Sequence, residues 1–145
     1  MTLLADSKQA KYAQEKALKA AEVGEIPPPK DPEKRASFAQ DLPGFLRFFF
    51  PHLYFRPFSD DQLSAVMKIQ NALIEGGQFA EAMPRGTGKT TIIEGAMIWS
   101  ICYALRRYLV VIGSDKDASE AIIDDVKEEF ETNELLCDYF PEICK

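Results

Sequence analysis

The hydrophobic positions in the middle of the chain follow the spacing of an α-helix. Apolar side chains recur every three or four residues over 63–74, and the pair Gly76-Gly77 interrupts the pattern. Ser59 and Gln62 have the spacing of a capping box, in which each side chain bonds the backbone of the other residue. The sequence therefore predicts a helix that begins after Ser59 and ends before Gly76.

Two short stretches after this helix have the composition of β-strands. Residues 78–83 (QFAEAM) are short and strand-like, and residues 108–113 (YLVVIG) are rich in β-branched side chains. Further helices are predicted from about 89 to 105 and over 117–131. Strand, loop, helix, strand, helix is the order typical of an α/β fold with a parallel sheet.

The first part of the chain has a different character. Residues 6–23 carry alanines at helical spacing, and residues 25–35 are rich in proline and charge, so residues 1–35 are predicted to be a helical arm and a proline-rich linker outside the core. Residues 36–58 contain eight aromatic side chains. These could stack on nucleic-acid bases, but four of them fall on a short predicted helix over 45–50, which favours packing against the main domain.

Composition narrows the class of protein. The chain has 145 residues, 46% of them hydrophobic, which suits one compact domain. Its three cysteines have no paired metal spacing, and their odd number argues against a disulfide framework. No apolar run is long enough to span a membrane without a charge, and the first residues (MTLLADSKQ) lack the features of a secretion signal. We therefore expect a protein of the cytoplasm, neither secreted nor bound to a membrane.

Charged side chains do not form a DNA-binding patch in the sequence. Residues 91–145 hold five basic and twelve acidic side chains, and no cluster of lysine and arginine is visible elsewhere. A protein that grips DNA through its phosphates needs such a cluster. If nucleic acid is a partner, its main contact surface lies elsewhere or on another chain. The only histidine, His52, follows a proline and is interpreted as structural.

The loop after the first predicted strand carries the strongest functional signal. Residues 83–91 read MPRGTGKTT, a Walker A phosphate-binding pattern between a strand and a helix. Gly86 and Gly88 allow the backbone to curl so that its N–H groups face phosphate oxygens, and the helix N-terminus adds further N–H groups. Lys89 is expected to reach the β- and γ-phosphates of ATP, and the Thr90 hydroxyl is expected to bind Mg²⁺.

Two side chains near this pattern each have two interpretations. Arg85 either stabilises transition-state charge at the γ-phosphate, which makes it the candidate catalytic residue, or pairs with a surface carboxylate. Gln62 either contacts the adenine edge or only caps its helix. Met83 departs from the full Walker pattern, which begins with glycine or alanine. The predicted nucleotide-binding residues are Gln62, Pro84, Arg85, Gly86, Thr87, Gly88, Lys89, Thr90 and Thr91.

Acidic residues near the predicted strands do not supply a catalytic carboxylate. Glu81 lies in the first strand, where it must sit near a rim or meet a polar group. Ile122-Ile123-Asp124-Asp125 has the letters of a Walker B strand, but an apolar stripe at four-residue spacing through 118, 122, 126 and 130 favours a helix with solvated acids. The sequence therefore predicts no Walker B carboxylate and no general base for water.

Residues 45–145 resemble the N-terminal ATPase region of the large terminase subunit of tailed bacteriophages, a DNA-packaging motor. The resemblance rests on MPRGTGKTT with its arginine, on FSDDQ one helix earlier, and on the stretch from RRYLVVIGSDKD to DYFPEIC. It implies a partial P-loop NTPase of the additional-strand type in residues 36–145, with ATP and Mg²⁺ as cofactors. It also implies hydrolysis that drives double-stranded DNA into capsids, with a small subunit and the portal as partners in an oligomer.

Carried over by position, the resemblance gives roles to four residues. Lys89 and Thr90 would hold the phosphates and Mg²⁺, Arg85 matches the arginine of the family's loop, and Gln62 matches its adenine-contacting glutamine. Such subunits continue to a Walker B strand and a nuclease domain, so the chain is expected to be the front of a longer protein or a truncated prophage relic, weak or inactive alone. Its uncovered apolar surface also predicts marginal stability or self-association.

Two other interpretations stay open at this point. The chain could be a stand-alone nucleotide-binding adaptor that recruits a partner through residues 1–35 without hydrolysis. It could also belong to a helicase-like or AAA-type ATPase, because GTGKT alone fits those enzymes. Arg85 and the missing first glycine make this last interpretation weaker.

Overall fold

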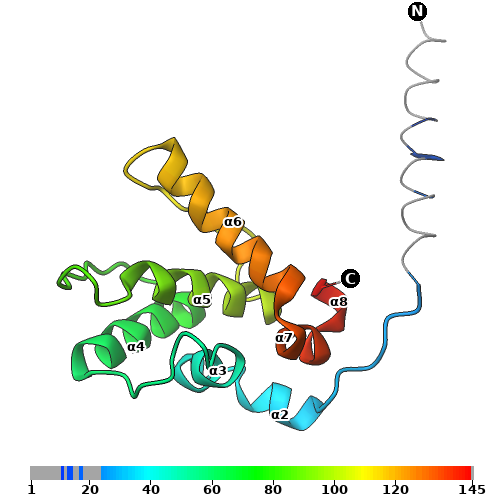
Figure 1. The fold of residues 1–145 in the computed structure, drawn as a ribbon, viewed down its shortest axis with the longest axis horizontal. Helices are drawn as coiled ribbons and strands as arrows, with labels where there is room; N and C mark the ends of the chain where they lie inside the picture. The colour runs from blue at the N-terminus through cyan, green and yellow to red at the C-terminus, as the bar shows by residue number, and fades with distance from the viewer. Residues whose placement is uncertain (1–10, 12, 15–16, 18–23, 145) are drawn as a thin grey trace, which may run out of the picture.

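The protein is an assembly of helices joined by loops (Figure 1). The structure is a computed structural model, and it describes residues 11, 13–14, 17 and 24–144. Helix α5 lies among α3, α4 and α6 and contacts all three. The described helices are α2 (Pro32–Ser37), α3 (Leu42–Phe49), α4 (Asp60–Glu75), α5 (Lys89–Cys102), α6 (Lys116–Thr132), α7 (Glu134–Tyr139) and α8 (Pro141–Cys144).

The predicted α/β fold, a partial P-loop NTPase with a parallel sheet, is wrong for this structure. The described residues contain no β-strand. Residues 78–83 and 108–113 are irregular connections, and neither makes a backbone–backbone hydrogen bond to any other described residue. A strand exists only when its backbone pairs with a neighbour. Strand-like composition at two sites therefore did not produce a sheet, because the two segments do not pair with each other.

The helices predicted from hydrophobic spacing are confirmed, with small shifts at their ends. The Ser59 side chain accepts from the Gln62 backbone and the Gln62 side chain accepts from the Ser59 backbone, so α4 has the predicted capping box, and Gly76 follows its last residue. Helix α6 turns 118, 122, 126 and 130 inward, as predicted, and its aspartates 124 and 125 are exposed. The Walker B interpretation of residues 122–125, which the sequence analysis disfavoured, is therefore excluded, and the predicted helix is confirmed.

Helix α5 ends at Cys102, three residues earlier than predicted. Ala104 has a φ of 50°, in the left-handed region that glycine usually occupies. The backbone N–H of Leu105 donates to the Ser100 carbonyl at 2.9 Å, which is the six-residue closure of a Schellman motif. An alanine hides this stop from sequence analysis, because alanine is otherwise the best helix former.

The N-terminal region departs from the predicted linker. The predicted helix over 6–23 lies mostly outside the described residues; its described positions 11, 13–14 and 17 are helical and exposed. The end of the predicted linker is helical, because the Asp31 side chain accepts from the Lys34 N–H at 2.9 Å and Pro32 occupies the first turn of α2.

This segment also contacts the C-terminal helices. The Lys30 backbone and side chain both donate to Asp138, each at 2.9 Å, and Arg35 pairs with Glu142 and donates to the Tyr139 carbonyl at 3.2 Å. The Arg35 guanidinium also lies 4.3 Å from the centre of the Phe140 ring. Residues 30–35 are thus joined to α7 and α8 by charged and cation–π contacts.

Of the eight aromatic residues over 36–58, Phe38, Phe45, Phe49 and Phe50 are buried in the core, as predicted from their grouping, whereas Phe55 is exposed. Phe45 is fully buried, and Phe49 and Phe50 are 1% exposed. Trp99 of α5 is also fully buried, and its indole N–H donates to the Phe38 carbonyl at 2.8 Å. Tyr103, directly after α5, also joins the rings, with its centroid 6.1 Å from that of Phe45 and 5.4 Å from that of Phe140. No helix in the part of the chain that the structure describes combines the length and hydropathy needed to cross a membrane.

We expect Trp99→Ala to lower the free energy of unfolding by about 3–5 kcal/mol. The change empties a large volume at the centre of the aromatic core and removes the indole donor to the Phe38 carbonyl, which keeps only the Asp41 N–H. Urea denaturation followed by circular dichroism measures the loss. Phe55→Ala is the matched control: this ring is 72% exposed, so its removal should change stability by less than about 0.5 kcal/mol. Equal losses in both variants would contradict the packing described here.

Candidate functional site

The predicted phosphate-binding loop lies at the N-terminus of α5 and is glycine-dependent. Gly86 and Gly88 both have a φ of 79°, and Gly88 is the residue before the first turn of the helix. Side chains other than glycine adopt this conformation rarely. No atom outside the loop approaches within 4 Å of either Cβ position, so the space beside both glycines is open. The backbone turn that the sequence predicted is present without the flanking strand.

Two side chains close the loop on itself. The Lys89 Nζ donates a hydrogen bond to the Met83 carbonyl, across the whole loop. The Thr87 hydroxyl donates to the Pro84 carbonyl at 2.8 Å. Lys89 and Thr90 are exposed, so the ammonium group and the hydroxyl remain in contact with solvent. These two hydrogen bonds close the loop, and its one lysine lies over it.

The helix start beneath the loop offers unpaired donors. No side chain caps the N-terminus of α5, and Ile92 is the first residue of the helix region whose N–H bonds back, to the Gly88 carbonyl at 2.9 Å. The first N–H groups of an uncapped helix carry partial positive charge and favour an anion. Within the described part of the chain, the N–H groups of Lys89, Thr90 and Thr91 have no protein acceptor. An anionic ligand would satisfy them.

Gln62 is joined to this loop. Its Nε2 donates to the Thr87 carbonyl at 2.8 Å, while its Oε1 accepts from the Ser59 N–H at 3.0 Å. The capping interpretation of Gln62 is confirmed, and the same amide also fixes the loop. The adenine-contacting interpretation stays a prediction. On the other side, the Tyr54 hydroxyl donates to the Thr91 carbonyl at 3.0 Å.

Arg85 and Glu81, the other two charged residues that the sequence analysis singled out, have different surroundings. Arg85 is exposed at the tip of the loop, and it has no hydrogen bond or ion pair with any residue that the structure describes. Glu81 is half-buried and pairs with Lys68 of α4 at 2.7 Å. Lys68 is thus the polar partner that Glu81 required, and the sequence did not reveal it because the two lie on different elements.

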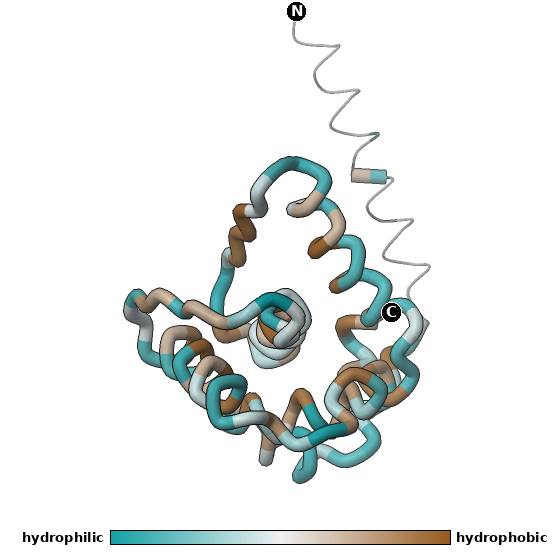
Figure 2. Tube along the Cα trace, turned by 60° about the vertical axis from the view of Figure 1, so that its left-hand side comes forward, coloured by the Kyte–Doolittle hydropathy of each residue, from teal (hydrophilic) through white to brown (hydrophobic). Residues whose placement is uncertain are grey.

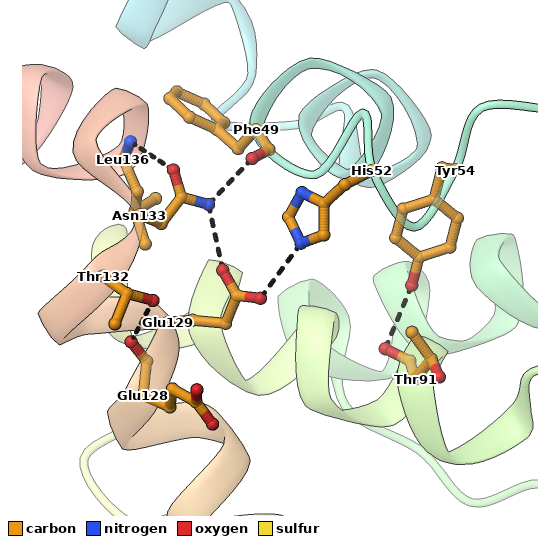
Figure 3. Close-up of polar contacts among 9 residues, drawn as sticks. All are labelled: Phe49, His52, Tyr54, Thr91, Glu128, Glu129, Thr132, Asn133 and Leu136. Carbon is orange, nitrogen blue, oxygen red and sulfur yellow. Dashed lines mark hydrogen bonds and ion pairs between the residues drawn. The ribbon is translucent and has the colours of Figure 1, made fainter.

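A second concavity, of about 480 Å³, opens on the opposite side of the first turns of α5. Its lining includes Tyr54, Glu94 and Asp125, and also His52, Glu128, Glu129 and Thr132, which are drawn in Figure 3. Glu129 accepts from the His52 ring at 3.3 Å and from the Asn133 amide at 3.0 Å. Sequence analysis missed this concavity, because its members come from three separate segments with no common motif.

Burial and like charge alter the protonation of this concavity. The pKa of Glu94 rises to about 7, first because the carboxyl is partly desolvated and then because Asp125 and Glu129 lie nearby. Burial, with the charges of Glu94 and Glu129, also raises the pKa of the Tyr54 hydroxyl. A protonated Glu94 can donate to the Asp125 carboxylate, whereas an ionised one repels it.

Comparison of this chain with protein-family models, with curated proteins and with solved structures gives no match. Assignment of the site therefore depends on its own geometry and chemistry.

A metal ion would have few protein ligands here. Among the described residues, no three histidine, cysteine, aspartate or glutamate side chains are grouped to hold one. Mg²⁺ commonly keeps several waters and is bound mainly by substrate phosphates. The exposed Thr90 hydroxyl, next to Lys89 at the start of α5, fits that chemistry as a single protein ligand.

We expect the stability of the protein to fall as the pH rises through 7, and Glu94→Gln to reduce this fall. The pKa of Glu94 is about 7 in the folded protein and lower in the unfolded chain. At a pH between the two pKa values, folding takes up a proton, so the stability that the protonated carboxyl contributes falls with rising pH and is lost as the pH passes about 7. Between pH 6 and pH 8, the free energy of unfolding should fall by about 1 kcal/mol more in the wild type than in Glu94→Gln, after allowance for solvent screening.

Urea denaturation at both pH values measures this effect. Glu120→Gln, an exposed carboxylate on α6, is the control, and it should follow the wild type. Identical pH profiles for wild type and Glu94→Gln would show that Glu94 is ionised in the folded protein throughout this range.

Proposed function

We propose that this protein binds a nucleoside triphosphate, ATP together with Mg²⁺, at the loop formed by residues 83–91. The observation that carries the proposal is the closed loop above an uncapped helix start. Lys89 lies across the loop, Gly86 and Gly88 are in left-handed conformations, and the first N–H groups of α5 have no described acceptor. This combination provides a cation, a concave backbone and aligned dipoles, which is what a phosphate chain requires.

Each loop residue has a distinct role in this proposal. The Lys89 ammonium leaves the Met83 carbonyl and bonds phosphate oxygens, so the ligand replaces a hydrogen bond that the loop already makes. The Thr90 hydroxyl supplies one ligand to Mg²⁺, and the phosphates supply others. Arg85 is exposed at the tip, where its guanidinium can approach the terminal phosphate. Pro84, Thr87 and Thr91 hold the shape of the loop.

The narrower proposal is that the chain is the ATP-binding N-terminal portion of a terminase large subunit, whose parent packages double-stranded DNA into capsids. The hydrogen bond from Gln62 to Thr87 supports it, because it joins the two motifs, FSDDQ and MPRGTGKTT, on which the resemblance rests. The small subunit, the portal and a bacterial host cytoplasm belong to the same proposal. The helical fold does not contribute support, so the loop and Gln62 carry this proposal alone.

Binding without hydrolysis, as in a nucleotide-binding adaptor, is the second candidate. It is favoured by the positions of the two carboxylates closest to the loop in sequence. Glu81 is engaged by Lys68, and Glu94 lies in the concavity on the other side of α5. Glu81 shares the lining of a small cavity with Met83 and Lys89, but its carboxylate is taken up by the ion pair with Lys68. If the purified chain hydrolyses ATP and the Lys89→Ala variant does not, the protein is an ATPase rather than a nucleotide-binding adaptor.

We expect Lys89→Ala to weaken ATP binding by at least about tenfold, which corresponds to about 1.4 kcal/mol or more. Titration of the protein with a fluorescent ATP analogue and Mg²⁺, followed by anisotropy, measures the dissociation constant. Lys116→Ala removes an exposed lysine of α6 and should leave it unchanged. Gly88→Ala should also weaken binding, because its φ of 79° disfavours a side chain, whereas Gly24→Ala should not. The absence of saturable binding to wild type would refute the proposal.

Removal of the Thr90 hydroxyl should make ATP binding less sensitive to Mg²⁺. Thr90→Val preserves the size of the side chain and deletes the proposed ligand atom. In the same titration, the ratio of affinities with Mg²⁺ and with excess EDTA should shrink several-fold relative to wild type. An unchanged ratio would show that Thr90 does not bind Mg²⁺. The Lys89→Ala experiment would still test ATP binding independently.

A further inference from the structure

A third concavity, of about 520 Å³, lies between α2, α3 and the segment that follows α3. Its lining combines aromatic rings with two cations, and includes Phe48, Tyr54, Phe55, Lys34 and Arg47. No described acidic side chain lines it, although the chain carries 23 aspartates and glutamates. The concavity beside Glu94, by contrast, is lined by carboxylates. The third concavity is therefore aromatic and basic, in a chain of net charge −6.

The cations at this concavity have no described counter-ion. Within the part of the chain that the structure describes, Lys34, Arg47 and the neighbouring Arg56 form no ion pair. Asp41 lies just before α3, but its carboxylate accepts from the Gly44 N–H as the cap of that helix. Positive charges from three segments thus gather here, which favours an anionic ligand. Sequence analysis found no basic cluster, because the three cations are separated along the chain.

The aromatic rings add flat apolar surface to these charges. Phe55 is 72% exposed, and the Arg56 guanidinium lies 5.4 Å from the centre of its ring. The Lys34 ammonium lies 5.2 Å from the centre of the Phe48 ring. A cation is therefore held beside each of these two rings. A stacking face next to a positive charge is the combination that suits a base and the phosphate attached to it.

We propose that this concavity binds single-stranded nucleic acid, with one base stacked on Phe55 and the adjoining phosphates paired with Lys34, Arg47 and Arg56. Stacking on an exposed ring and pairing of the backbone with cations are the two interactions by which proteins hold single strands without reading their sequence. The site is separate from the loop at residues 83–91, which contributes no residue to its lining. The proposal therefore does not depend on ATP binding.

The exposed ring selects a single strand over other anionic partners. In a duplex the bases stack on one another inside the helix, so no base face is free to lie on Phe55. An acidic peptide could pair with the cations, but it has no flat ring to cover the Phe55 side chain. Single-stranded nucleic acid supplies both the negative charge and the flat face.

The number of cations sets the expected dependence on salt. Each phosphate that a protein neutralises on a single strand contributes about −0.7 to the slope of log K against log salt concentration. Lys34, Arg47 and Arg56 together should therefore give a slope of about −2. Because the rest of the chain is acidic, binding is expected to be measurable mainly at low salt.

The first test measures the role of the ring. The full chain is titrated into a labelled oligothymidylate at low salt without nucleotide, and anisotropy gives the dissociation constant. Phe55→Ala should raise this constant at least about fivefold through the loss of stacking, whereas Phe55→Trp should preserve the affinity. Tyr108→Ala is the control and should bind as the wild type does. Tyr108 is 89% exposed, on the connection between α5 and α6 that Figure 2 shows as a hydrophobic stretch outside the helices.

The second test measures the role of the cations. Arg47→Ala should weaken binding and make the salt slope shallower by about 0.7, because one phosphate loses its partner. Lys116→Ala removes an exposed lysine of α6 and should leave the affinity and the slope unchanged. Circular dichroism and the urea midpoint show that the variants are folded.

Competition identifies the class of ligand. Unlabelled oligothymidylate or oligouridylate should displace the probe, and the more effective of the two shows whether DNA or RNA is preferred. Tighter binding of a hairpin duplex, or equal displacement by polyglutamate, would overturn the proposal in favour of a duplex or an acidic protein. No saturable binding to the wild type, or an unchanged affinity of Phe55→Ala, would also overturn it, and either result would leave the ATP proposal unaffected.

Discussion

The packing of aromatic rings around the second half of α5 is the interaction on which the rest of the structure depends. Trp99 fills the centre of this packing, and its indole N–H bonds the Phe38 carbonyl, so α5 is fixed to the segment that joins α2 and α3. At the other end of the helix, Lys89 and Thr90 are exposed while Ile92 is buried. The loop at residues 83–88 and the concavity beside Glu94 both lie at that exposed end.

The two sides of the first turns of α5 have opposite chemistry. The loop side presents Lys89, Arg85 and unpaired N–H groups, all of which favour an anion. The other side gathers Glu94, Asp125 and Glu129, which repel one another and would repel an anion. Thr91 belongs to this second side, since it lines the concavity and its carbonyl accepts from Tyr54 there. An anionic ligand therefore has one side of the helix available to it.

Local signals in the sequence were more informative than long-range ones. Capping boxes, helical stripes and the Gly-Lys-Thr loop involve residues within one turn of each other, and the structure contains the helices and the loop turn that they predict. Strand composition at 78–83 and 108–113 says nothing about which backbone would pair with each segment, and no pairing occurs in the described chain. The pair His52–Glu129 spans 77 positions, so only the folded chain brings it together.

The single amide of Gln62 couples two parts of the molecule. One of its atoms holds the start of α4 and the other holds the Thr87 carbonyl, so neither can move far without affecting the other. A ligand that draws the loop away from Gln62 must also work against the cap of α4, and a ligand that keeps the bond reinforces it. Loss of this one side chain would therefore remove half of the capping box of α4 and one anchor of the loop together.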